Sequence, residues 1–157
     1  MPRNPSASIE IDASIDLVWS VMLDTARYGE WNPFIERAEC AYPPKPGDPI
    51  VLHVRWTNGR TTRSPERIKI VEPPVSEGGV TSATLAYEYE GIGAKLGLVR
   101  GIRWQRLTQP TGGVTTYRTV EEFSGPLVKL AGPARVEEGF RRHAEALKRH
   151  VEGLHSL

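Results

Sequence analysis

The sequence is poor in cysteine, in net charge and in long apolar runs, and each scarcity excludes a class of protein. Cys40 is its single cysteine, so no disulfide can form within the chain. Its 20 basic and 19 acidic residues lack the basic excess of a typical nucleic-acid-binding domain. No apolar run approaches the ~18 residues of a membrane span, and the N-terminus lacks the apolar core of a signal peptide. We therefore expect a single cytoplasmic domain over residues 1–157, with no nucleic-acid partner and no integral membrane segment.

The first 34 residues predict a strand followed by two short helical segments. Residues 8–12 alternate apolar and polar side chains, which is typical of a half-buried strand. Four apolar residues then recur at i, i+3, i+4 and i+7 behind Ser14, which indicates an amphipathic helix that ends at Asp24. The segment that follows, TARYGEWNPF at 25–34, carries three aromatic residues three positions apart. Gly29 and Asn32–Pro33 disfavour a regular helix there.

The middle of the chain predicts strands joined by tight turns. The expected strands cover residues 35–42, residues 50–56, a returning strand that ends at Pro73–Pro74, a strand after Gly78–Gly79, and residues 99–108 and 114–123. Asn58–Gly59 predicts a two-residue type I′ hairpin turn with positive φ at both positions. Five to seven consecutive strands of this kind imply an antiparallel sheet.

The end of the chain predicts one long helix that begins near Pro133. An apolar stripe steps along it by three or four residues: Val136, Phe140, Ala144, Leu147, Val151 and Leu154. Three i,i+4 ion pairs are expected on its other face: Glu137–Arg141, Glu138–Arg142 and Glu145–Arg149. Because each such pair contributes only ~0.2–0.5 kcal/mol, the apolar stripe must hold the helix in place.

These elements predict an α+β helix-grip fold: a curved antiparallel sheet wrapped around a long C-terminal helix, with two short helices after the first strand. A sheet of this size has an apolar face that must be covered, and only the C-terminal helix is long enough to cover it. A curved sheet around one helix leaves a space between them. We expect the aromatic segment at 25–34 to close one end of that space, with Trp31 and Phe34 enclosing a ligand.

Three stretches resemble the START/Bet v 1-like (SRPBCC) superfamily, in particular its bacterial polyketide cyclase/dehydrase-like branch. They are IEIDASIDLVWSVMLDTARYGEWNPFIERAE, GGVTTYRTVEEFSGPL and EEGFRRHAEALKRHVEGL. The resemblance covers nearly the whole chain and implies the helix-grip fold. It does not imply one activity, because that superfamily includes lipid and sterol carriers, hormone binders, aromatases/cyclases and proteins that act on other proteins.

Aromatic residues are the candidate ligand contacts. They lie on elements expected to face inward, and tyrosine hydroxyls among them would need buried partners, as a ligand pocket can offer. The set is Trp31, Phe34, Trp56, Tyr87, Tyr89, Trp104, Tyr117 and Phe140. For any single ring, plain core packing is the competing interpretation. The alternation of residues 114–123 leaves open whether Glu121 or Arg118 points inward, where it could orient a ligand or transfer a proton.

Motifs for cofactors, metals and nucleophilic catalysis are lacking. Residues 91–97, GIGAKLG, lack the βαβ context of a dinucleotide loop and are expected to form a hairpin at the cavity rim. His143 and His150 are expected at solvated helix edges, and Cys40 as a small buried residue. There is no Gly-x-Ser-x-Gly elbow and no phosphate-binding loop. We therefore expect no cofactor and no metal, and the sequence names no catalytic residue.

The leading functional hypothesis is binding or transport of a hydrophobic or aromatic small molecule, lipid-like or polyketide-like, in the internal cavity. The first alternative is a polyketide cyclase, aromatase or dehydrase-type enzyme that uses acids and bases of the cavity. A protein-interaction module is the second alternative, which a filled core without a cavity would favour. No stretch marks a dimer seam, and a weak homodimer stays open.

Overall fold

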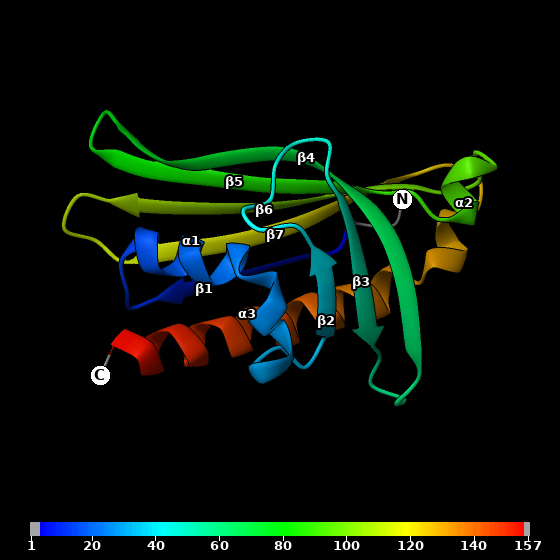
Figure 1. The fold of residues 1–157 in the computed structure, drawn as a ribbon, viewed down its shortest axis with the longest axis horizontal. Helices are drawn as coiled ribbons and strands as arrows, with labels where there is room; N and C mark the ends of the chain where they lie inside the picture. The colour runs from blue at the N-terminus through cyan, green and yellow to red at the C-terminus, as the bar shows by residue number, and fades with distance from the viewer. Residues whose placement is uncertain (1–3, 156–157) are drawn as a thin grey trace.

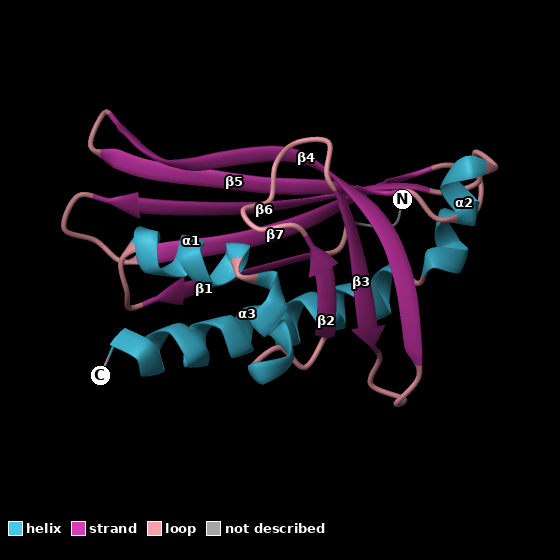
Figure 2. Ribbon diagram, viewed as in Figure 1, coloured by secondary structure: helices cyan, strands magenta, loops and turns pink. Residues whose placement is uncertain are grey.

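A seven-stranded antiparallel sheet and one long helix form the frame of the molecule (Figures 1 and 2). The structure is a computed structural model that describes residues 4–155. Its strands, in the spatial order β1-β7-β6-β5-β4-β3-β2, are β1 (Ser6–Ile11), β7 (Thr115–Ser124), β6 (Arg100–Pro110), β5 (Val80–Tyr89), β4 (Thr61–Glu77), β3 (Pro49–Arg55) and β2 (Ile35–Cys40). The sheet curves around the long C-terminal helix α3 (Pro133–His155), so the expected α+β helix-grip fold is confirmed.

Two short helical elements carry the chain from one edge of the sheet to the other, as the sequence predicted. Helix α1 (Ile15–Leu23) begins behind Ser14, whose Oγ accepts a hydrogen bond from the Leu17 amide at 3.2 Å. It buries Val18 and Met22 against the sheet and ends at Asp24. The 3₁₀ helix η1 (Thr25–Glu30) follows directly and leads into β2.

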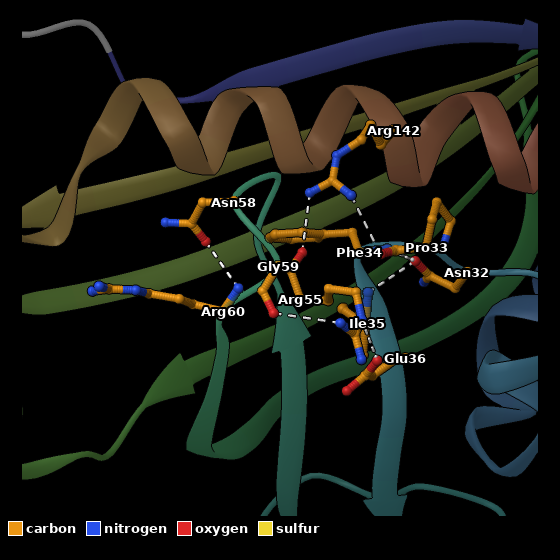
Figure 3. Close-up of polar contacts among 10 residues, drawn as sticks. All are labelled: Asn32, Pro33, Phe34, Ile35, Glu36, Arg55, Asn58, Gly59, Arg60 and Arg142. Atoms are coloured by element: carbon orange, nitrogen blue, oxygen red, sulfur yellow. Dashed lines mark hydrogen bonds and ion pairs between the residues drawn. The ribbon is translucent and has the colours of Figure 1, made fainter.

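Helix α3 crosses the concave face of the sheet and buries the predicted apolar stripe from Val136 to Val151. Leu154, the last expected member, is 40% exposed and lies outside the stripe. Arg142 does not pair with Glu138 as predicted. It donates instead to the carbonyl oxygens of Pro33 and Arg55, so it ties the helix to the chain around β2 and β3 (Figure 3).

Strand β4 is longer than the sequence predicted and continues through Pro73–Pro74 to Glu77. The register between β4 and β5 shifts between Glu72 and Val75, so the two prolines lie at an irregularity of the ladder. Proline has no N–H to donate, and such irregular positions are where strands accept it.

The turn at Asn58–Gly59 also differs from its prediction. Gly59 has a φ of 83°, but no non-glycine residue in the described part of the chain has a positive φ. The Gly59 amide donates to the Trp56 carbonyl oxygen at 2.9 Å, and the Trp56 amide donates to the Arg60 carbonyl oxygen at 2.9 Å. The loop therefore has three residues, and the two-residue type I′ prediction is wrong. The backbone of Asn58 is not left-handed, and its side-chain Oδ1 accepts a hydrogen bond from the Arg60 amide (Figure 3).

The two halves of α3 face different surroundings. Its second half packs Leu147 and Val151, both fully buried, into a filled core with α1. Its first half, from Arg135 to Phe140, borders a cavity instead. Two short elements lie at this end of the molecule: α2 (Ile92–Lys95), where a hairpin was expected, and the 3₁₀ helix η2 (Val128–Ala131). Among residues 4–155, no helix is both long and apolar enough to cross a membrane.

Candidate ligand-binding cavity

A cavity of about 380 Å³ lies between the sheet and the first half of α3. This volume is within the range of about 300–1,000 Å³ that is usual for small-molecule sites. Its walls come from β2–β7 and α3, while Ile92 of α2 and Leu130 of η2 lie at its edge, largely exposed to solvent. Most of the wall is apolar or aromatic: Phe34, Ile35, Leu52, Val54, Trp56, Tyr87, Tyr89, Leu98, Val99, Phe123, Leu127, Val136 and Phe140.

Five of the eight aromatic residues proposed from the sequence line this cavity: Phe34, Trp56, Tyr87, Tyr89 and Phe140. Phe34 stands between two of the others, 5.6 Å from the Trp56 ring and 6.0 Å from the Phe140 ring, in edge-to-face contacts. The Arg135 guanidinium lies over the Trp56 ring, 4.3 Å from its centre. The aromatic wall is therefore continuous from β2 to α3.

Trp104 and Tyr117 do not line the cavity. Successive residues of a strand point to opposite faces, and on β6 the buried set is Gly101, Arg103, Gln105 and Leu107. Trp104 therefore lies on the other face of the sheet, where the Arg106 guanidinium stacks 4.5 Å from its ring. Tyr117 points inward but is completely buried beneath the cavity, where its hydroxyl donates to Gln105 at 2.7 Å.

Trp31, which the sequence grouped with Phe34 as a residue that encloses a ligand, also lies outside the cavity wall. Its ring packs edge-on against Tyr28 at 5.3 Å and stacks on His150 of α3 at 5.6 Å. These contacts hold η1 against the helix. Phe34, three residues later, does line the cavity as expected.

Asn32 is the residue that turns the chain from η1 into the cavity wall. Its Oδ1 accepts hydrogen bonds from the amides of Phe34 at 3.0 Å and Ile35 at 2.9 Å (Figure 3). Its Nδ2 therefore faces the other way and lies 3.2 Å from His143 Nδ1 on α3. One buried side chain thus fixes a turn without regular hydrogen bonds and joins it to the helix.

His143 is buried, with 1% of its surface exposed, contrary to the helix-edge position that the sequence suggested. Its ring stacks on Tyr117 with 6.0 Å between centres. Burial, and secondly the charge of Arg103, hold the pKa of His143 well below its usual value, so the ring is neutral. Because Nδ1 accepts from Asn32, the proton of the neutral ring is on Nε2.

Arg103 forms the polar floor of the cavity. Its guanidinium donates to Thr119 Oγ1 at 2.9 Å, to the Tyr87 hydroxyl at 2.9 Å and to the Tyr117 hydroxyl at 3.2 Å, and it lies 4.2 Å from the Phe140 ring centre. Burial alone would lower its pKa, but the neighbouring tyrosines and Glu121 outweigh burial and hold the pKa above the usual arginine value. A buried permanent charge is therefore present at the inner end of the site.

Two carboxyl groups, Glu66 of β4 and Glu121 of β7, line the same cavity. Glu121 is thereby the inward residue of its strand, and Arg118 points outward. Burial raises the pKa of Glu121 to about 7, against the opposing effect of Arg103. Burial, and secondly the neighbouring Glu121, raise the pKa of Glu66 well above its usual value. The pair therefore retains a proton near neutral pH and can take part in proton transfer.

Sequence reasoning missed Asn32, Glu66, Arg103 and His143. For Glu66 a signal was available, because it alternates with Ile68 on a strand whose apolar face was evident. For Arg103 there was none, because a charged side chain on the inward face of a strand breaks the rule by which faces are assigned. Within residues 4–155, no group of three or more His, Cys, Asp or Glu side chains is placed to hold a metal ion.

Comparison with known proteins identifies the family and the fold of this chain. A model of the family described as "Polyketide cyclase / dehydrase and lipid transport" matches residues 4–152. The chain belongs to this family. No curated protein matches the chain.

Solved structures similar to this member of the polyketide cyclase/dehydrase family share its fold at low sequence identity. The Zhui aromatase/cyclase from Streptomyces sp. R1128 is 17% identical with a TM-score of 0.71, over 96% of this chain and 93% of that one. Norcoclaurine synthase from Thalictrum flavum is 17% identical with a TM-score of 0.64, over 98% and 96%. A hypothetical protein from Helicobacter pylori is 10% identical with a TM-score of 0.71, over 95% and 88%. The family match and the shared fold together indicate that this chain has a fold of the kind that binds hydrophobic ligands.

Proposed function

We propose that this protein binds a small hydrophobic or aromatic molecule, lipid-like or polyketide-like, in the cavity between the sheet and α3. The observation that carries the proposal is the cavity itself: about 380 Å³ with a largely aromatic wall and a few buried polar groups at its inner end. A filled core would have favoured a protein-interaction module. An apolar ligand of this size gains roughly 25 cal/mol for each Å² of apolar surface that it removes from water.

A pair of matched substitutions on β3 tests the binding proposal. Val54 lines the cavity, while Val51 lies on the opposite face of the same strand and does not line it. The neutral fluorescent probe N-phenyl-1-naphthylamine should bind the wild-type protein and the Val51→Phe variant with similar affinity. Val54→Phe places a ring in the cavity and should weaken probe binding about ten-fold or more. Equal binding by both folded variants, checked by circular dichroism, would place the probe elsewhere and reject the proposal.

A second candidate function is an enzyme of the polyketide cyclase, aromatase or dehydrase type. Glu66 and Glu121 favour it, because two buried carboxyl groups that retain a proton beside Arg103 can act as general acid and base. Native mass spectrometry of freshly purified protein, followed by extraction, can identify a retained compound. Conversion of that compound by the wild-type protein but not by Glu121→Gln would support the enzyme. Its unchanged release would support a carrier.

A further inference from the structure

The carboxyl groups of Glu66 and Glu121 face open space at the polar end of the cavity. Gly101, which lies opposite Phe123 in the β6–β7 pairing, lies beside the Glu121 carboxyl group. A Cβ at Gly101 would meet the Phe123 ring at 3.2 Å and Glu121 Oε1 at 3.4 Å. The glycine leaves room beside the carboxyl group that any other residue would fill.

The two carboxyl groups bring hydrogen-bond acceptors to this end of the cavity. Oε2 of Glu121 is buried and has no hydrogen-bond partner among the described residues. Glu66 uses Oε2 to accept from Ser64 Oγ at 2.7 Å. Arg103, a buried donor that lines the same cavity, directs three of its N–H groups to hydroxyl oxygens. A ligand that satisfies this site must therefore bring donors.

We propose that the molecule bound in the cavity carries a protonated amine, which binds between Glu66 and Glu121 while its apolar body lies along the aromatic wall. The inference rests on the proposed binding function and names the chemical class of the ligand. Two carboxylates face one buried guanidinium, so a single additional positive charge balances the site. The rings of Tyr87, Tyr89 and Phe123, which line the same space, also attract a cation.

Ligands of other charge fit this end less well. A carboxylate or phosphate would face two carboxyl groups, and three of the Arg103 N–H groups already bind hydroxyl oxygens. A neutral hydroxyl could donate one hydrogen bond but would leave the second carboxyl group without a counter-charge, so that it must keep its proton. The amine is thus the group that uses both carboxyl groups at once.

Amine binding should depend on pH because the ammonium takes the place of the retained proton. The groups that face Glu121 are Arg103 of β6, Tyr87 of β5 and Glu66 of β4, and Arg135 of α3 lines the same cavity. Glu121 changes its charge between pH 6 and pH 8, because burial raises its pKa into this range. With a pKa of about 7, the ionised fraction of Glu121 rises about ten-fold over that range, and amine affinity should rise about ten-fold with it.

Displacement of N-phenyl-1-naphthylamine by three ligands with the same ring system tests the inference. We expect 2-(1-naphthyl)ethylamine to displace the probe at a concentration about ten-fold lower than 2-(1-naphthyl)ethanol at pH 8, with 1-naphthylacetate weakest. The advantage of the amine over the alcohol should shrink at pH 6. Glu121→Gln should abolish this advantage, and circular dichroism checks that the variant is folded. Glu122→Gln, the exposed neighbour on the same strand, should preserve it.

Each outcome separates this inference from the proposed function. If the probe does not bind at all, the binding function fails. If the probe binds but the amine and the alcohol displace it equally at both pH values, the cavity binds ligands and the amine inference is overturned. An amine advantage that persists in Glu121→Gln also overturns it, because the preference would then arise elsewhere.

Discussion

Replacement of Gly139 by alanine should destabilise the protein, although the same change usually stabilises a helix. Gly139 lies in the first half of α3, directly beneath the Phe34 ring. A Cβ at Gly139 would lie no further than 2.5 Å from three atoms of that ring, whereas carbon atoms normally pack at about 3.5–4.0 Å. Phe34 would have to move by about 1 Å or more. It cannot do so freely, because Trp56 and Phe140 pack against it at 5.6 and 6.0 Å between ring centres.

The expected magnitude follows from two opposing effects. Alanine in place of glycine in a helix interior is favourable by about 0.8–1.0 kcal/mol. Forcing additional volume into a packed site usually costs about 1–3 kcal/mol. We expect a net loss of roughly 1 kcal/mol in the free energy of unfolding, together with weaker probe binding as Phe34 moves into the cavity. The control is Gly153→Ala in the same helix, where the added Cβ meets nothing within 4 Å. That variant should be as stable as the wild type or more stable.

Urea denaturation followed by circular dichroism measures both variants, and a double-mutant cycle with Phe34→Leu assigns the cause. In the Phe34→Leu background the ring is absent, so Gly139→Ala should become neutral or stabilising, with a coupling energy of about 1–2 kcal/mol. If Gly139→Ala is as stabilising as Gly153→Ala in the wild-type background, the close contact between Phe34 and α3 is wrong. The description of this side of the cavity would then fail with it.

Three further predictions test the cover helix, the turn and the carboxyl pair. Leu147→Asp should cost about 4 kcal/mol or more because it buries a charge in the filled core, while Leu154→Asp, at a position 40% exposed, should change stability little in the same urea experiment. Asn32→Ala should cost about 2–3 kcal/mol because it removes the acceptor of two buried amides, whereas Asn58→Ala, which removes one exposed hydrogen bond, should cost well under that. The folded state raises the pKa of Glu121 to about 7 from 4.5, so it binds the proton more tightly than the unfolded state, and stability should fall as pH rises through this interval. Glu121→Gln should flatten that slope in urea melts between pH 5 and pH 8, and parallel slopes would contradict the assignment.

The apolar parts of the structure could be predicted from the sequence because their signals are local. The stripe on α3 repeats at helical spacing over five turns, and one stripe defines one buried face. Strand β6 shows where this logic fails. Its inward face carries Arg103 and Gln105, while its outer face carries Trp104. The prediction that aromatic residues point inward therefore assigned the wrong face to this strand. A buried guanidinium is stable there only because hydroxyl groups from β5 and β7 accept its hydrogen bonds. The register of the sheet brings these partners together, so the sequence of β6 alone does not reveal them.

The segment at 25–34 illustrates a second limit. Residues three apart share one side of a 3₁₀ helix, and Tyr28 of η1 does pack against Trp31, which directly follows η1. The regular spacing ends at Asn32, whose side chain redirects the backbone so that Phe34 enters the cavity wall. The spacing therefore grouped Trp31 with Phe34. Because of the turn at Asn32, however, Trp31 packs against α3 while Phe34 lines the cavity.

We propose that a small apolar molecule binds between the sheet and the first half of α3. Intermolecular nuclear Overhauser effects between N-phenyl-1-naphthylamine and the methyl groups of the protein would locate the bound probe. We expect contacts to Leu52, Val54 and Val136, which line the cavity, and none to Val51 or to the exposed Val80. Contacts to Val51 or Val80 without contacts to the cavity methyl groups, at a probe concentration that saturates the protein, would contradict it.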